Sequence, residues 1–179
     1  MLRLFAALEI PHEVRRAIAS IGSGLPEARW VAPESLHITL RFIGEVDVDV
    51  AEDVDAELVG VRARRFSIAL SGLDCFESSG RVRAVWVPVV AGEELTQLQR
   101  GIEHAVRRAG VAPDSHKFVP HVTLTRLRRV RVDEVVPYLQ HHGDFRAGPF
   151  AVDRFTLFRS HMGRGGSHYE PLAHYDLSA

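Results

Sequence analysis

The chain has 179 residues, of which 46% are hydrophobic and 25% are charged, and its formal net charge is −1. This composition excludes a disordered chain, because it supplies enough apolar side chains for a core. A charge so close to neutral argues against a protein that coats nucleic acid nonspecifically, although a local basic cleft is compatible with it. No apolar stretch approaches the roughly 20 residues that a membrane-spanning helix needs.

The first half of the chain alternates between strand and helix patterns. Apolar residues at helical spacing follow Pro11, and glycines end that helix, whereas strict alternation marks the strand that begins at Phe66. The predicted order is strand, helix, strand, helix, strand, over Leu2–Ile10, Pro11–Ile21, Ser35–Ile43, Val46–Val59 and Phe66–Ser71.

The same order then begins again. Gly92 precedes a second amphipathic helix, and Gly110 ends it. The glycines after residue 162 predict a hairpin turn in the tail, which runs to Leu177. The predicted elements are strand, helix, strand, helix, strand over Arg83–Val90, Leu95–Val106, Phe118–Leu127, Val132–Leu139 and Phe150–Phe158.

This repeated order predicts a duplicated α+β fold. Each lobe would be an antiparallel sheet with helices outside, and the two lobes would enclose a central cleft. No linker rich in Pro, Gly or Ser separates the halves, which run roughly from 1 to 80 and from 81 to 179. We therefore expect residues 1–179 to form a single bilobal domain.

Two short segments, one in each half, nearly repeat each other: His37–Leu40 reads His-Ile-Thr-Leu and His121–Leu124 reads His-Val-Thr-Leu. Side chains alternate between the faces of a strand, so the histidine and threonine of each segment share one face while the apolar residues pack on the other. The duplication predicts one such segment on each wall of the cleft.

This pair of segments suits acid/base cleavage of a phosphodiester without a metal. A neutral histidine can take a proton from water, and a protonated one can give a proton to the leaving oxygen. The hydroxyls of Thr39 and Thr123 can donate hydrogen bonds to phosphate oxygens, where negative charge builds up. The alternative is two structural histidines, which a single His-x-Thr would favour but a matched pair does not.

Other sequence features point away from cofactors and disulfides. Adjacent His141 and His142 have no Cys or carboxylate at ligand spacing, so they predict an exposed helix end and no metal site. No phosphate-binding glycine loop is present, so no cofactor is expected. Cys75 is the only cysteine, which together with the lack of a signal peptide predicts a cytoplasmic protein.

In these features the chain resembles the 2H phosphoesterase superfamily, which is named for its two His-x-Thr-x motifs. Within it, the chain is most similar to the bacterial and archaeal RNA 2′,3′-cyclic phosphodiesterases, also called 2′-5′ RNA ligases. The resemblance covers most of the chain, and the segments that carry it are Arg3–Ala7, Trp30, Leu36–Gly44, Arg83–Trp86, Phe118–Arg126, Phe155–Ser160 and Tyr169–Leu172.

The resemblance implies a hydrolase that opens an RNA 2′,3′-cyclic phosphate to a 2′-phosphomonoester. It implies that His37 is the proton donor to the leaving 3′ oxygen and that His121 is the proton acceptor. Because the two motifs are nearly equivalent, the sequence alone does not show which histidine is the acid and which is the base. The same chemistry, with a 5′ hydroxyl in place of water, would give reversible 2′-5′ RNA ligation.

Three further residues are predicted to bind substrate. The family pattern has an aromatic residue after the first motif, here Phe42, and an arginine after the second, here Arg126. Strict alternation places both opposite the histidines and leaves Arg41 and Thr125 in phase with them. Either a bulge or the strand end turns Phe42 and Arg126 into the cleft, or one of them is structural, so Arg41 stays a candidate.

The expected partner is RNA that ends in a 2′,3′-cyclic phosphate, with tRNA fragments as one source, and we expect no membrane contact and a monomer. The arginines from 126 to 131 offer either a path for the RNA strand or a solvated face. Alternative functions are a phosphodiesterase for small cyclic nucleotides or 2′-5′ oligonucleotides, and a noncatalytic RNA-binding module.

Overall fold

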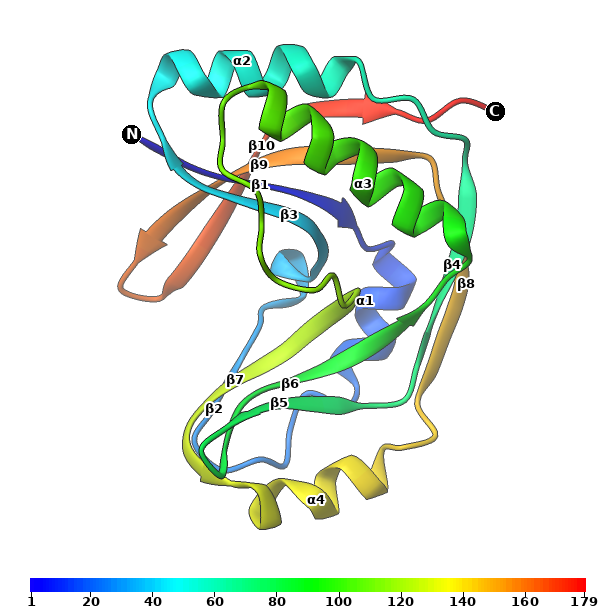
Figure 1. Ribbon diagram of the computed structural model, residues 1–179. Coiled ribbons are helices and arrows are strands. Elements are labelled where there is room, and N and C mark those ends of the chain that lie inside the picture. The colour runs from blue at the N-terminus through cyan, green and yellow to red at the C-terminus, as the bar shows by residue number, and fades with distance from the viewer.

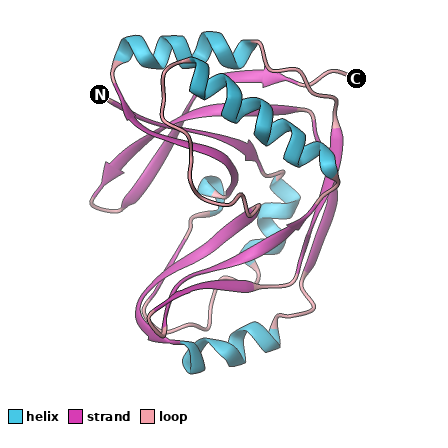
Figure 2. Cartoon of the chain, in the orientation of Figure 1, coloured by secondary structure: helices cyan, strands magenta, loops and turns pink.

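The computed structural model describes residues 1–179 as a mixed α+β fold in which a strongly curved sheet carries helices on its outside (Figures 1 and 2). The strands are β1 (Leu2–Glu9), β2 (Ala28–Trp30), β3 (His37–Val46), β4 (Phe66–Ser71), β5 (Asp74–Ser78), β6 (Arg81–Val90), β7 (His121–Arg131), β8 (Arg146–Val152), β9 (Arg154–Gly163) and β10 (Gly166–Asp176). The helices are α1 (His12–Ala19), α2 (Val48–Val59), α3 (Glu93–Arg108) and α4 (Val132–His141), and a short 3₁₀ turn spans Pro33–Ser35.

All strand pairs in the sheet are antiparallel, and the main path runs β10-β9-β1-β3-β7-β6-β4-β8. The strands β10, β9, β1 and β3 form the first lobe, and β7, β6, β4 and β8 form the second. Strand β2 pairs with β7, and β5 pairs with β6. The lobes meet where β3 and β7 pair, at Ile38 and Val122.

The two lobes exchange elements. Strand β4 lies in the first half of the chain but pairs with β6 and β8, whereas β9 and β10 come from the second half and pair with β1 and with each other. Helix α3 likewise packs against α2 and β3 of the first lobe, and α1 packs against β8 of the second. The duplicated bilobal α+β fold with a central cleft is therefore confirmed, and each lobe is built from both halves of the chain.

One cluster of buried apolar side chains runs continuously through both lobes. The fully buried Leu4, Ile38 and Val122 supply it from the strands, and Leu98 and Ile102 supply it from the inner face of α3. This common core fixes the lobes to each other, so the residues at the β3–β7 junction have a defined separation.

The strand predicted over Phe150–Phe158 is wrong as one element. It is two strands, β8 and β9, that part at Asp153 and enter different lobes. The short strands β2 and β5 were not predicted, since three and five residues carry little periodic signal. The predicted tail hairpin is present, with Gly163 opposite Gly166 at its turn.

Candidate active site

The two motifs occupy matching places at the starts of β3 and β7. His37 and Thr39, and likewise His121 and Thr123, are half-buried, while Ile38 and Val122 between them are fully buried. The pairing of Ile38 with Val122 sets the motifs side by side at the centre of the sheet. The polar residues of both motifs line one cleft of about 790 Å³.

A bulge interrupts the alternation at the fourth residue of each motif. On β3, Thr39 and Arg41 pair with the neighbouring residues Ala7 and Ala6 of β1, so Leu40 has no partner of its own. On β7, Leu124 is skipped in the same way against β6. A bulge shifts the facing of every later residue by one position.

The bulges decide which predicted residues reach the cleft. Phe42 and Arg126 are exposed and line the cleft with the histidines. Thr125 is fully buried on the other face. The expectation from strict alternation is wrong here, and the alternative of a bulge is confirmed.

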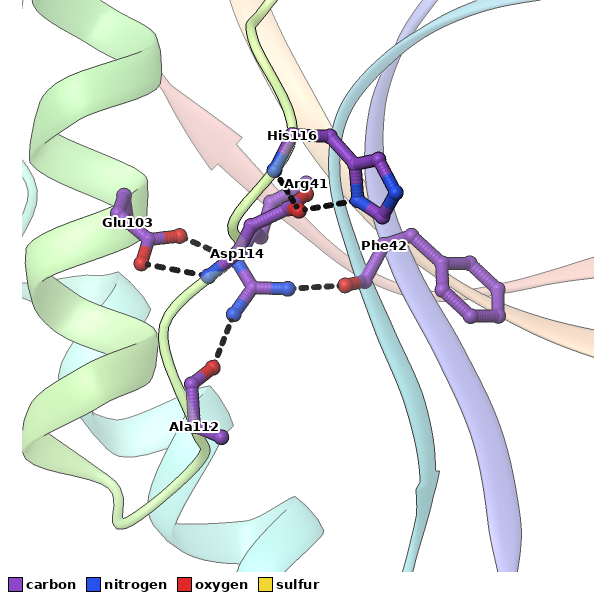
Figure 3. A network of polar contacts seen from close by, with 6 residues as sticks. All are labelled: Arg41, Phe42, Glu103, Ala112, Asp114 and His116. Carbon is purple, nitrogen blue, oxygen red and sulfur yellow. Dashed lines mark hydrogen bonds and ion pairs between the residues drawn. The ribbon is translucent and has the colours of Figure 1, made fainter.

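The structure does not bring Arg41 to the cleft, which corrects its placement among the substrate-binding residues. Its side chain is only 5% exposed and forms an ion pair with Glu103 of α3 (Figure 3). Its guanidinium also donates hydrogen bonds to the carbonyl oxygens of Phe42 and, at 2.5 Å, of Ala112. Because all of its contacts lie behind β3, Arg41 has no path to a ligand between the histidines.

The Arg41 network also holds the segment that leads into the second motif. The Glu103 carboxylate accepts a hydrogen bond from the backbone N–H of Asp114 at 3.3 Å, and the Asp114 carboxylate accepts one from the backbone N–H of His116 at 2.9 Å (Figure 3). The network therefore ties β3 to the connection between α3 and β7. It adds a polar connection between the first lobe and the segment that leads into the second motif.

Both histidines are oriented by backbone carbonyls. Nδ1 of His37 donates to the Ser35 carbonyl at 2.8 Å, and Nδ1 of His121 donates to the Val119 carbonyl at 2.6 Å. With Nδ1–H fixed in this way, Nε2 of each neutral ring is the free basic nitrogen. Nε2 of His37 lies 3.1 Å from the Thr39 hydroxyl.

The environment favours the neutral form of both rings. Burial lowers the pKa of His37 below 6.5, and the charges of His121 and Arg126 lower it further, while the hydrogen bond to Ser35 opposes them. Burial and the charge of Arg126 also lower the pKa of His121, against the hydrogen bond to Val119. A bound phosphate would supply the negative charge that stabilises a protonated ring.

Aromatic rings flank each histidine. His37 lies 5.0 Å from the Phe5 ring and 5.1 Å from the Tyr169 ring. His121 lies 5.0 Å from the Phe76 ring and 5.3 Å from the Trp86 ring, with centroids compared in each case. These rings limit the motion of the imidazoles and keep water from one side of each.

The cleft is cationic although the chain is not. None of the residues that line it is acidic, and five are arginines: Arg3, Arg29, Arg83, Arg126 and Arg128. Arg3 also lies over the Phe42 ring, with its guanidinium carbon 5.1 Å from the centroid. A confined site with unopposed positive charge favours an anionic ligand.

Sequence reasoning missed part of this site. Of the predicted run of arginines, Arg126 and Arg128 line the cleft, whereas Arg129 and Arg131 do not. Arg3, Arg29 and Tyr169 come from strands far away in sequence. Arg3 and Tyr169 lie in segments that carry the family resemblance, which assigns them no role, and the three residues of β2 give no periodic signal for Arg29. No group of three or more His, Cys, Asp or Glu side chains gathers as metal ligands would.

Comparisons with known proteins agree with this geometry. A profile of the 2′-5′ RNA ligase superfamily matches residues 10–164. The RNA 2′,3′-cyclic phosphodiesterase of Aeropyrum pernix is 37% identical over 159 residues, which cover 88% of this chain and 89% of the relative. The protein of that name from Escherichia coli K12 is 32% identical over 180 residues, which cover 98% and 97%.

Solved structures show the same fold. The crystal structure of E. coli LigT complexed with 3′-AMP matches with a TM-score of 0.81 at 28% identity, covering 99% of each chain. TT0787 of Thermus thermophilus matches with a TM-score of 0.78 at 25% identity, covering 98% of this chain and 97% of that one. The chain belongs to the 2′-5′ RNA ligase superfamily, and its predicted resemblance to the 2H phosphoesterases is confirmed.

Proposed function

We propose that this protein hydrolyses RNA 2′,3′-cyclic phosphate ends to 2′-phosphomonoesters. The observation that carries the proposal is the meeting of two His-x-Thr pairs across one cleft without acidic residues. Membership of a superfamily whose curated relatives are RNA 2′,3′-cyclic phosphodiesterases supports the choice of substrate. The same relatives make the enzyme a hydrolase.

In the proposed reaction, Nε2 of His121 takes a proton from water as the water oxygen bonds to phosphorus. The bond from phosphorus to the 3′ oxygen breaks, and protonated His37 gives its Nε2 proton to that oxygen. Each transfer contributes roughly 10²–10⁴ in rate. Thr39, Thr123 and Arg126 hydrogen-bond the phosphate oxygens, and Phe42 stacks on the base of the terminal nucleotide.

With a 5′ hydroxyl in place of water, the same attack on the cyclic phosphate would form a 2′-5′ linkage and release the 3′ oxygen as a hydroxyl. The proposal includes no metal and no cofactor, because the two histidines and Arg126 supply the acid, the base and the positive charge. We further propose that residues 1–179 form one bilobal domain, that the protein is a cytoplasmic monomer and that tRNA fragments are among its substrates. No helix of the structure has the length and hydropathy needed to cross a membrane.

Incubation with an RNA oligomer that ends in a 2′,3′-cyclic phosphate tests the activity. We expect a 2′-phosphate product that forms equally well in EDTA. A 3′-phosphate product would reverse the leaving group, and loss of turnover in EDTA would overturn the metal-free mechanism. Tight RNA binding without turnover would favour a noncatalytic binding module.

A substrate whose bridging 3′ oxygen is replaced by sulfur shows which histidine is the acid and which is the base. Because a thiolate leaves without protonation, loss of the acid matters little for this substrate. We expect His37→Ala to regain most of its lost turnover on the sulfur substrate and His121→Ala to regain none. If His121→Ala regains turnover instead, His121 is the acid and His37 is the base.

A further inference from the structure

Besides Arg126, and Arg3 over the Phe42 ring, three arginines in the cleft have no polar partner within the protein. The guanidiniums of Arg29, Arg83 and Arg128 form neither an ion pair nor a hydrogen bond with any other residue, yet all three line the cleft. Arginines elsewhere do find carboxylates, as Arg108 does with Glu57 at 2.6 Å and Arg131 does with Asp133 at 3.0 Å. Positive charge without a partner in a confined space is available to an anionic ligand.

The strand register gathers these arginines beyond the second motif. Arg29 of β2 lies opposite Arg126 of β7, and Ala84 of β6 pairs with Arg126 from the other side. Arg83 precedes Ala84, at the place where the β6–β7 register shifts. Arg128 follows Arg126 by two residues on the same face of β7, which places their Cα atoms about 7 Å apart.

The group is separate from the reacting centre. On β7, Arg126 lies closer to His121 than Arg128 does, and the charge of Arg126 lowers the pKa of both histidines. Arg126 is therefore the arginine that serves the phosphate under attack. Arg83 and Arg128 lie further along the cleft and Arg29 lies beside Arg126, where a second anionic group of the same ligand would reach them.

We propose that Arg29, Arg83 and Arg128 form a second phosphate subsite, which holds an internucleotide phosphodiester of the RNA strand whose cyclic end lies between the histidines. This inference rests on the proposed function and makes the preferred substrate an oligonucleotide. The planar guanidinium suits this role, because it presents paired donors to two phosphate oxygens.

The test compares three substrates that share one cyclic end: a mononucleotide 2′,3′-cyclic phosphate, a dinucleotide with the same end, and that dinucleotide with a neutral methylphosphonate linkage. We expect kcat/KM to be about 10-fold higher for the charged dinucleotide than for the other two, as one charge-assisted contact would give. The double variant Arg83→Gln/Arg128→Gln should lose this advantage and keep the wild-type kcat/KM on the mononucleotide.

Arg129→Gln is the matched control, because Arg129 is an exposed arginine on the same strand that does not line the cleft. It should leave all three rates unchanged. If the double variant lowers the mononucleotide and dinucleotide rates by the same factor, the subsite is overturned, because the positive potential of the whole cleft would then explain the effect. The subsite is also overturned if the double variant keeps the rate advantage of the charged dinucleotide.

Binding separates this inference from the proposed function. Calorimetric titration with a 2′-phosphorylated mononucleotide and dinucleotide needs no turnover. We expect the dinucleotide to bind about 10-fold more tightly to the wild type and no more tightly to the double variant. Equal binding of both by the wild type would overturn the subsite even if hydrolysis is observed. Absence of hydrolysis with this binding difference intact would overturn the proposed reaction and leave the subsite supported.

Discussion

The two walls of the cleft have the same backbone plan and different side chains. Both motif strands follow one burial pattern over their first six residues, with a bulge at the fourth. After the bulge, the first wall presents Phe42 and the second presents Arg126. The duplicated backbone thus supplies two equivalent histidines, and the residues after the bulges give the walls separate tasks.

The difference continues behind the sheet. The first residue after the bulge is Arg41 on β3, bound to Glu103 and two carbonyl oxygens, and Thr125 on β7, whose hydroxyl donates to the Arg126 carbonyl at 3.3 Å. One wall is therefore tied to a helix and a loop by a buried charge. The other relies on neutral packing.

The largest expected effect tests whether both walls take part in the chemistry. His37→Ala and His121→Ala should each lower kcat on a cyclic-phosphate RNA by roughly 10²–10⁴-fold, because each removes one proton transfer. The double variant should lose less than the product of the two, since the residues act as a unit. Steady-state rates measure this, with His116→Ala as control, because His116 is exposed and outside the cleft.

A second prediction concerns the residues behind the walls. Arg41→Met should lower the free energy of unfolding by about 3 kcal/mol, because it leaves the carboxylate of Glu103 without its partner. Thr125→Val should cost about 1 kcal/mol or less, the worth of one neutral hydrogen bond. Urea denaturation measures both. Equal losses would mean that the Arg41 network adds nothing to the stability of the first wall.

Glu103→Gln in the Arg41→Met background is the control for that prediction. It removes the unpaired charge, so part of the lost stability should return. If the double variant is no more stable than Arg41→Met, the cost arises from lost packing of the arginine side chain and not from the unpaired carboxylate.

A third prediction separates the tasks of the two walls. Arg126→Gln should lower kcat by about 10²-fold, because it removes a donor to the charge that develops on the phosphate. Phe42→Leu should raise KM by about 10-fold and leave kcat nearly unchanged, since stacking on a base holds substrate and transition state alike. An abasic substrate should abolish the effect of Phe42→Leu and not that of Arg126→Gln. The same KM and kcat changes in both variants would contradict this division.

Much of the fold could be predicted because the repeat was visible in element order. The helices and the motif strands follow from the spacing of apolar residues and from glycines at their ends. The exchange of β4 and β9 between lobes could not be predicted, because pairing between strands far apart in sequence leaves no mark on local periodicity. Asp153, where β8 ends and β9 begins, looks like the interior of one strand for the same reason.

The limit of prediction from sequence is clearest in the direction in which the side chains of Phe42, Arg41 and Arg126 point. Within Leu40–Arg41 nothing in the residue types marks an extra residue, because the partner strand decides whether a bulge forms. The resemblance implied that Phe42 and Arg126 face the substrate, while alternation favoured Arg41. The register of β3 against β1 and of β7 against β6 turns Phe42 and Arg126 toward the cleft.

The smallest expected effect is on the pH dependence of stability. Burial lowers the pKa of both motif histidines in the folded protein, so the unfolded chain binds more protons as the pH falls below about 6.5. The free energy of unfolding should therefore decrease between about pH 8 and pH 5, a range in which histidines are the side chains that titrate. His142, whose pKa is also lowered, contributes a background present in every variant below.

The two walls should differ in this property as well. Burial is the main cause of the lowered pKa of both histidines, and His37 is the more deeply buried of the two rings. His37→Gln should therefore flatten the decrease more than His121→Gln does, as measured by urea unfolding across the same pH range. Identical curves for both variants would show that the walls have the same electrostatic environment, and a curve that rises toward acid pH in the wild type would contradict the lowered pKa values themselves. The expected inequality means that the second wall takes up a proton first in the free protein, so a bound phosphate must favour protonation of His37 if that residue is the acid.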